Sequence, residues 1–148
     1  MIYVSLEDVD PFSVEAVGNY EEELEVTQSN GIKVRALLIS NPHNPPGIKI
    51  DSTVSICILA VTQEIWSEPV LTTMISKGQC YPVETLLAFF RLCQKYQIHL
   101  ISDEIYALSI FEGMNPNALP FTSVLSIDTE GLIDSSLLHV LYGMSKVS

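Results

Sequence analysis

The second half of the chain contains the stretch Ile98-His99-Leu100-Ile101-Ser102-Asp103-Glu104-Ile105-Tyr106. Its beginning is a short and largely apolar run, which is typical of a strand buried in a sheet. Polar residues follow that run without a spacer. We therefore expect Asp103 and Tyr106 to lie at the carboxyl end of a buried strand.

Two further apolar runs have the same form. Arg35–Ser40 is followed by the loop Asn41–Gly47, and Leu137–Tyr142 is followed by Lys146. Apolar residues that are continuous rather than alternating are typical of parallel strands covered on both faces. Residues 82–97 carry an apolar stripe at helical spacing, which predicts a helix that begins near its proline. The sequence therefore predicts an α/β fold, with a mainly parallel sheet and flanking helices.

Shorter elements are expected elsewhere. The apolar run Ile2–Ser5 predicts a short strand. Apolar spacing within residues 20–27 predicts a helix, and Asn30-Gly31 is typical of a left-handed turn that closes one. A further short element is expected within Phe121–Ile127, in a connection that is otherwise rich in glycine and proline.

Composition limits the class of protein. The 148 residues are 47% hydrophobic and 17% charged, as expected for one globular core. The net charge is −11 and the seven basic residues are scattered, so we expect no nucleic-acid partner and no anionic membrane surface. The three cysteines form no CxxC pair, which favours reduced thiols over a disulfide framework or a metal site. The start of the chain is acidic, and no apolar stretch approaches the roughly 20 residues of a membrane span, so we expect a cytoplasmic protein.

The polar residues at the strand ends fit one cofactor, pyridoxal 5'-phosphate. Ligands of open α/β sheets bind outside the carboxyl ends of the strands, where residues distant in sequence converge. The amine of Lys146 can form a Schiff base with an aldehyde and can move a proton on the substrate α-carbon. Asp103 can hold a pyridine nitrogen protonated, and Asn44 and Tyr106 can donate hydrogen bonds to a phenolate oxygen. Taken singly, each residue also fits a surface, cap or turn position, and we assign no role to Glu104.

Three ordered motifs resemble those of the class I/II aminotransferases, in particular 1-aminocyclopropane-1-carboxylate synthase-like members: Asn41–Gly47, Leu100–Ala107 and Gly143–Lys146. The resemblance implies the large domain of a fold type I enzyme that forms a homodimer with shared sites. It implies that Lys146 is the lysine bound to the cofactor, with Asp103 at the pyridine nitrogen and with Tyr106 and Asn44 at the phenolic oxygen. It leaves open whether an α-amino acid undergoes transamination or lyase chemistry.

The chain also departs from the family pattern. Residues 48–78 intervene between two segments that are nearly continuous in the family, and the chain ends at Ser148, shortly after the lysine. Gly143 stands where many relatives have a phosphate-binding serine. Our hypothesis is that residues 48–78 and the ending are translated intron, and that Met1 is an internal start. We therefore expect an incomplete large domain that binds the cofactor weakly and has little turnover. The alternative is a noncatalytic protein that binds or regulates a full-length subunit.

Overall fold

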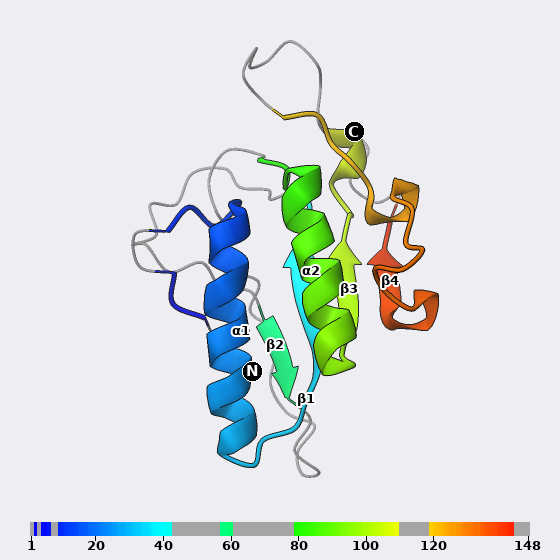
Figure 1. Ribbon diagram of the computed structural model, residues 1–148. Coiled ribbons are helices and arrows are strands. Elements are labelled where there is room, and N and C mark those ends of the chain that lie inside the picture. The colour runs from blue at the N-terminus through cyan, green and yellow to red at the C-terminus, as the bar shows by residue number, and fades with distance from the viewer. Residues whose placement is uncertain are drawn as a thin grey trace.

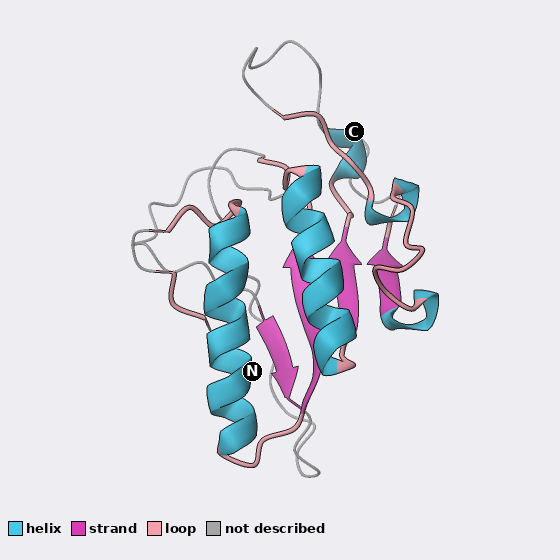
Figure 2. Ribbon diagram, in the orientation of Figure 1, coloured by secondary structure: helices cyan, strands magenta, loops and turns pink. Residues whose placement is uncertain are grey.

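The computed structural model describes residues 2, 4–6, 9–42, 57–60, 79–109 and 119–143. Within these residues, helices lie on one face of a four-stranded sheet whose strand order is β2-β1-β3-β4 (Figure 1; Figure 2). The longer elements are α1 (Val14–Ser29), β1 (Val34–Ser40), β2 (Cys57–Ala60), α2 (Val83–Tyr96), β3 (His99–Asp103) and β4 (Leu138–Leu141). Three short 3-10 helices are η1 (Ala107–Ser109), η2 (Val124–Ser126) and η3 (Ser135–Leu137).

The sheet is mainly parallel, as the sequence predicts. β3 pairs in parallel with β1 on one side and with β4 on the other. The arrows of these strands point the same way in Figure 1, and β2 points the opposite way. Leu37, Leu100 and Leu138 are register partners, and all three belong to or pack against the hydrophobic core beneath α1 and α2. The α/β class predicted from the apolar runs is therefore confirmed.

Helix α1 is longer than the predicted segment but lies where the spacing placed it. The side chain of Ser13 accepts a hydrogen bond from the Ala16 amide at 3.2 Å, which satisfies one of the free N–H groups of the first turn. Tyr20 and Leu24 are fully buried, as the predicted stripe requires. Gly31 follows the helix with φ 78°, so the chain turns there through a left-handed conformation.

Helix α2 supplies the centre of the core. Pro82 is its N-cap residue, and a proline loses nothing there because the first amides of a helix have no intrahelical partner. Leu86, Phe89 and Phe90 are fully buried. The ring of Phe89 meets the ring of Tyr20 on α1 at a centroid distance of 5.4 Å, so aromatic packing joins the two helices.

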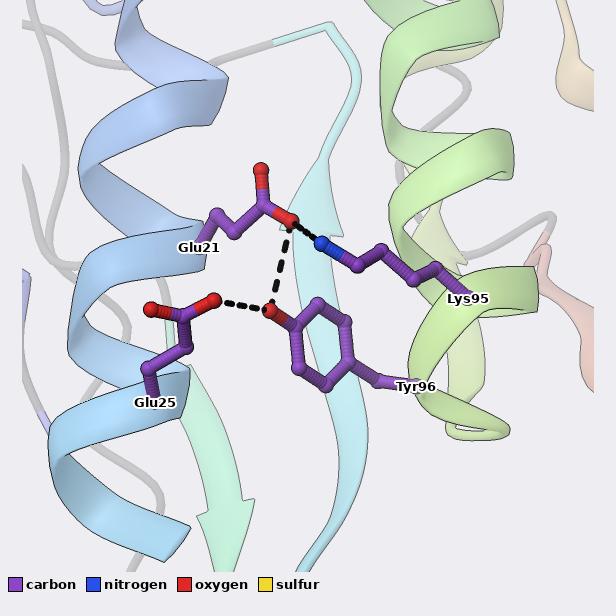
Figure 3. A network of polar contacts seen from close by, with 4 residues as sticks. All are labelled: Glu21, Glu25, Lys95 and Tyr96. Carbon is purple, nitrogen blue, oxygen red and sulfur yellow. Dashed lines mark hydrogen bonds and ion pairs between the residues drawn. The ribbon is translucent and has the colours of Figure 1, made fainter. Parts of the chain in front are cut away.

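Polar contacts also join α1 to α2 at the surface (Figure 3). Lys95 Nζ forms an ion pair with Glu21 Oε1 at 2.5 Å. The Tyr96 hydroxyl donates to Glu25 Oε1 at 2.9 Å and to Glu21 Oε1 at 3.2 Å. Glu21 and Glu25 of α1 thus both contact the neighbouring helix α2.

The strand predicted at Ile2–Ser5 is wrong for the residues that the structure describes. Ile2 forms only an isolated bridge, and residues 4–6 have no regular structure. Val4 and Leu6 are nevertheless 1% exposed and belong to the core. Their hydrophobicity is used for packing without strand pairing. The short element expected within Phe121–Ile127 is the 3-10 helix η2.

Most of residues 48–78, the segment interpreted as an insert, lies outside the described residues. The exception is β2, whose backbone pairs antiparallel with β1 over the register Val34↔Ala60 to Leu38↔Cys57. Part of the segment interpreted as an insert therefore pairs with the sheet. The interpretation of 48–78 as translated intron stays a prediction.

Candidate functional site

The three parallel strands end in step at one edge of the sheet. Asp103, the last residue of β3, is the register partner of Ser40 at the end of β1 and of Leu141 at the end of β4. The three strand ends are therefore neighbours in space, although they are distant in sequence. This is the edge at which α/β sheets bind ligands.

Asp103 lies at this edge as the sequence predicts. Its side chain is half-buried, and its Oδ1 accepts a hydrogen bond from the Ile105 amide at 3.1 Å, which fixes the turn after the strand. Side chains alternate along a strand, so Asp103 points to the face opposite Ser102 and Leu100 and away from the helices. Among the described residues, the second carboxylate oxygen has no hydrogen-bond partner.

Tyr106 follows in the turn that leads from β3 into η1. Tyr106 is partly exposed and lies three residues after Asp103, at the same edge of the sheet. The turn is fixed by the Asp103–Ile105 contact and by a hydrogen bond from the Ala107 amide to the Glu104 carbonyl at 2.9 Å. The structure therefore brings two of the predicted site residues to one short turn.

Asn44 and Lys146 lie outside the described residues. Described structure after β1 stops at Pro42, and described structure after β4 stops at Gly143. The strands that lead to both residues end in register with Asp103. Their roles toward a cofactor stay predictions.

The pyridine ring of pyridoxal phosphate needs one hydrogen-bond acceptor and one donor, and the structure describes a candidate for each. A protonated ring nitrogen needs an acceptor with negative charge, and Asp103 has a carboxylate oxygen without a partner among the described residues. A phenolate oxygen needs a donor, and Tyr106 supplies an O–H group a few residues away. Asp103 and Tyr106 are therefore the described residues that could hold the pyridine ring.

Sequence reasoning missed two buried polar residues at this edge, Asn41 and Glu104. Asn41 is 0% exposed and Glu104 is 3% exposed. Each comes directly after a strand and uses its side chain to bind neighbouring backbone groups. The available signal was their position: a polar residue inside a motif that directly follows an apolar strand has to be either exposed or hydrogen-bonded.

Other reactive groups are less suited to chemistry. Burial raises the pKa of the Cys80 thiol to about 11, which keeps it protonated and therefore weakly nucleophilic at neutral pH. His139 is exposed on β4, where its Nε2 is 2.9 Å from Nδ1 of His99, so the two rings are hydrogen-bonded to each other. Within the described ranges, no group of three metal-ligating side chains could hold a metal ion, and no helix has the length and apolar character needed to cross a bilayer.

The described part of the chain is an α/β domain with polar residues directly after the carboxyl ends of its parallel strands. Comparison with known proteins identifies the family. Residues 76–147 match the family model for aminotransferase class I and II, and this part of the chain belongs to that family. The described fold is consistent with part of an aminotransferase domain. No solved structure shows a significant match to the chain.

Several curated relatives extend the match toward the N-terminus. A probable aminotransferase of Claviceps purpurea, tcpI, is 34% identical over 98% of this chain and 26% of its own length. The probable inactive 1-aminocyclopropane-1-carboxylate synthase-like protein 2 of Homo sapiens is 29% identical over 97% of this chain and 18% of its own length. The 1-aminocyclopropane-1-carboxylate synthase of Glycine max is 27% identical over 85% of this chain and 19% of its own length. The chain thus spans 18% to 26% of the length of these relatives.

Proposed function

We propose that this chain forms part of a pyridoxal phosphate site in an enzyme that acts on α-amino acids. One observation carries the proposal: Asp103 lies in register between the ends of β1 and β4, the strands that lead to Asn44 and Lys146. Asp103 therefore lies between the two strands that precede Asn44 and Lys146 in the sequence. Membership of the aminotransferase class I and II family supports the same cofactor.

Each residue has a proposed role. The bound cofactor would supply an electron sink for the reaction at the substrate α-carbon. Asp103 would accept a hydrogen bond from the ring nitrogen and stabilise its protonated form. Tyr106 and Asn44 would donate to the phenolic oxygen. Lys146, the proposed catalytic residue, would hold the cofactor through its amine and move a proton at the α-carbon.

Two reactions remain open for the same residues. The names of relatives include probable aminotransferases and a 1-aminocyclopropane-1-carboxylate synthase, so we propose either transamination or lyase chemistry. The proposed residues contact only the cofactor and the α-carbon, and these are common to both reactions. Assaying a protein that includes these residues with S-adenosylmethionine, and separately with an amino acid and a 2-oxo acid, distinguishes the two.

We propose that the 148-residue chain by itself binds the cofactor weakly and shows little turnover. The chain spans 26% or less of the relatives' length, and the proposed roles of the described residues Asp103 and Tyr106 concern only the pyridine ring of the cofactor. Proteins of this family are often dimers, and we propose a homodimer with shared sites for the complete enzyme. Cys80 and Cys93 are free thiols, which supports a cytoplasmic location.

Covalent trapping tests the site directly. We expect incubation with pyridoxal phosphate, reduction with borohydride and peptide mass spectrometry to show the label on Lys146. Lys95 serves as the control because it is exposed and lies on α2, away from the strand ends. Equal labelling of both lysines would contradict a specific site. Replacing Asp103→Ala should reduce the label on Lys146 and leave the background on Lys95 unchanged.

A noncatalytic role is the second candidate. One human relative is named as probably inactive, although it matches 97% of this chain. In this case the chain would bind or regulate a full-length subunit instead of turning over a substrate. Co-purification of this chain with a full-length homologue, together with no labelling of Lys146, would favour that role.

A further inference from the structure

Two buried polar residues follow neighbouring strands at the candidate site. Asn41 comes after Ser40 of β1, and Glu104 comes after Asp103 of β3. Ser40 and Asp103 are register partners, so Asn41 and Glu104 stand at equivalent positions just beyond the sheet. Both are almost completely buried, at 0% and 3% exposure. Polar groups this deeply buried require hydrogen-bond partners.

Their backbones extend the sheet beyond its last paired residues. The Asn41 amide donates to the Asp103 carbonyl at 2.9 Å, which ties the end of β1 to β3. The Glu104 amide donates to the Leu141 carbonyl at 2.8 Å, which ties the end of β3 to β4. The peptide group between Asp103 and Glu104 is therefore bound from both neighbouring strands.

Their side chains reach the same short segment, residues 122–124. Asn41 Nδ2 donates to the Thr122 carbonyl at 3.0 Å. Glu104 Oε1 accepts from the Val124 amide at 2.9 Å and from the Ser102 hydroxyl at 3.1 Å. This segment is separated from the two strands in sequence, and Val124 is fully buried beside them.

Asn41 makes one further connection. Its Oδ1 accepts from the Tyr81 amide at 3.1 Å, directly before α2. One buried amide group thus joins the end of β1, the start of α2 and residues 122–124. We call Asn41, Glu104 and residues 122–124 together the strand-end brace.

We propose that Asn41 and Glu104 are positioning residues, and that the strand-end brace fixes the direction of the Asp103 carboxylate and the Tyr106 hydroxyl toward the cofactor. The inference rests on the proposed function. Side chains of successive residues point to opposite faces of the sheet. The Glu104 side chain is therefore on the face that the helices cover, and the Asp103 side chain is on the other face, where we propose that the ligand binds. Freeing the Glu104 side chain would remove its bonds to Ser102 and Val124 and leave the peptide held by its two backbone hydrogen bonds alone, which loosens the turn that carries Asp103 and Tyr106. A displacement of about 1 Å in a positioned group can cost about 100-fold in function.

Amide exchange tests whether the brace exists in solution. In Glu104→Ala, we expect faster hydrogen exchange at the Val124 amide, because its acceptor is removed. Glu104→Gln keeps an oxygen acceptor of the same reach and should retain slow exchange. Asn41→Asp keeps the acceptor for the Tyr81 amide but removes the donor to the Thr122 carbonyl, so it should loosen residues 122–124. Glu130→Ala, an exposed acidic residue, is the control. Unchanged exchange at Val124 in Glu104→Ala would overturn the brace.

A double-mutant cycle tests whether the brace acts through Asp103. With Asp103 present, Glu104→Ala should weaken pyridoxal phosphate binding by about 10- to 100-fold, the range typical of residues that orient a ligand-binding group. With Asp103→Ala already in place, the same change should cost much less, because the group that Glu104 orients is gone. Glu104→Gln should restore most of the binding. An equal loss in both backgrounds would show that Glu104 supports only the fold and would overturn the proposal.

The two experiments separate the possible failures. If the parent protein does not bind pyridoxal phosphate in a manner that depends on Asp103, the proposed function fails and the positioning role fails with it. If binding depends on Asp103 and the cycle is additive, the proposed function stands and only the positioning role fails. Nitrogen-15 labelled cofactor gives an independent readout, since the ring-nitrogen resonance reports the protonation that Asp103 is proposed to stabilise.

Discussion

At the scale of single residues, Tyr20 stands out because its hydroxyl is buried without a partner among the described residues. Burial raises the pKa of this phenol far above its ordinary value, so it stays neutral. An unsatisfied buried hydroxyl costs about 1 to 3 kcal/mol. We therefore expect Tyr20→Phe to stabilise the fold by about 1 kcal/mol, while keeping the ring contact with Phe89.

Chemical denaturation of the two proteins measures this difference. Tyr96→Phe is the matched control, because the Tyr96 hydroxyl donates to Glu21 and Glu25 and its removal should destabilise the protein. If Tyr20→Phe stabilises the protein and Tyr96→Phe destabilises it, the hydrogen bonding of each hydroxyl explains the difference, because the chemical change is the same. A loss of stability in Tyr20→Phe would mean that the hydroxyl has a partner in solution.

At the scale of elements, the end of α2 is strained at Gln97. This residue has φ 53° and ψ 46°, the left-handed conformation, which costs a residue with a Cβ roughly 1 to 2 kcal/mol. Gln97→Gly should stabilise the protein by about 1 kcal/mol, less the loss of the side-chain hydrogen bond to the Gln94 carbonyl. Thermal unfolding should show a higher midpoint.

The end of α1 supplies the reverse experiment. Gly31 has φ 78°, and a Cβ added there would meet no atom within 4 Å, so only backbone conformation opposes it. We expect Gly31→Ala to destabilise the protein by about 1 kcal/mol. If both substitutions left stability unchanged, the left-handed conformations at Gln97 and Gly31 would carry no measurable cost for a residue with a Cβ.

The polar contacts between α1 and α2 predict a pH dependence. The hydrogen bond from Lys95 lowers the pKa of Glu21 below its ordinary value of 4.5. A carboxylate with a lowered pKa in the folded state stabilises the fold above its unfolded-state pKa, and this contribution is lost as pH falls through the folded-state value. Glu21→Gln should therefore lower the stability of the protein slightly at neutral pH. Well below pH 4.5 the variant and the parent should be equally stable.

Urea titrations at both pH values measure this effect. The expected difference is small, because the ion pair is exposed and water screens it. Glu22→Gln is the control, since Glu22 is exposed on the same helix. A difference for Glu21→Gln that persists unchanged in acid would contradict the ion-pair explanation.

At the scale of the whole molecule, a hydrogen bond joins two residues on either side of the segment interpreted as an insert. The Tyr81 amide donates to Asn41 Oδ1 at 3.1 Å, although the two residues are 40 apart in sequence. If residues 48–78 were deleted, residues 42–47 and 79–80 could still span this gap. The deletion would leave residues 41–47 and 79–82 between β1 and α2, a connection longer than the about 2 to 6 residues common in strand-to-helix loops. The geometry is therefore compatible with a protein that lacks residues 48–78.

We expect the deletion of residues 48–78 to leave a folded domain with cooperative unfolding. Shortening the connection by about two doublings of length removes roughly 1 kcal/mol of loop-closure cost, which offsets part of the lost pairing between β1 and β2. Circular dichroism and denaturation measure this outcome, and transcript sequencing across the same codons tests the intron hypothesis. Loss of the folded state would show that residues 48–78 are an integral part of the domain.

Local patterns were sufficient to predict most elements of the fold. The apolar runs predicted β1, β3 and β4, and helical spacing predicted α1 and α2, because these signals depend on burial within a single segment. The strand at Ile2–Ser5 was wrong because an apolar residue can be buried in a core without joining a sheet. Pairing of β2 with β1 was missed because strand pairing joins segments that no local pattern connects.

The α/β class and the position of Asp103 and Tyr106 after a strand follow from local patterns, since an apolar run followed by polar residues places them at its end. The alignment of Ser40, Asp103 and Leu141 became visible only in the folded protein, because register depends on hydrogen bonds between separate strands. The burial of Asn41 and Glu104 was decided in the same way. Their partners at Thr122 and Val124 become neighbours only when the chain has folded.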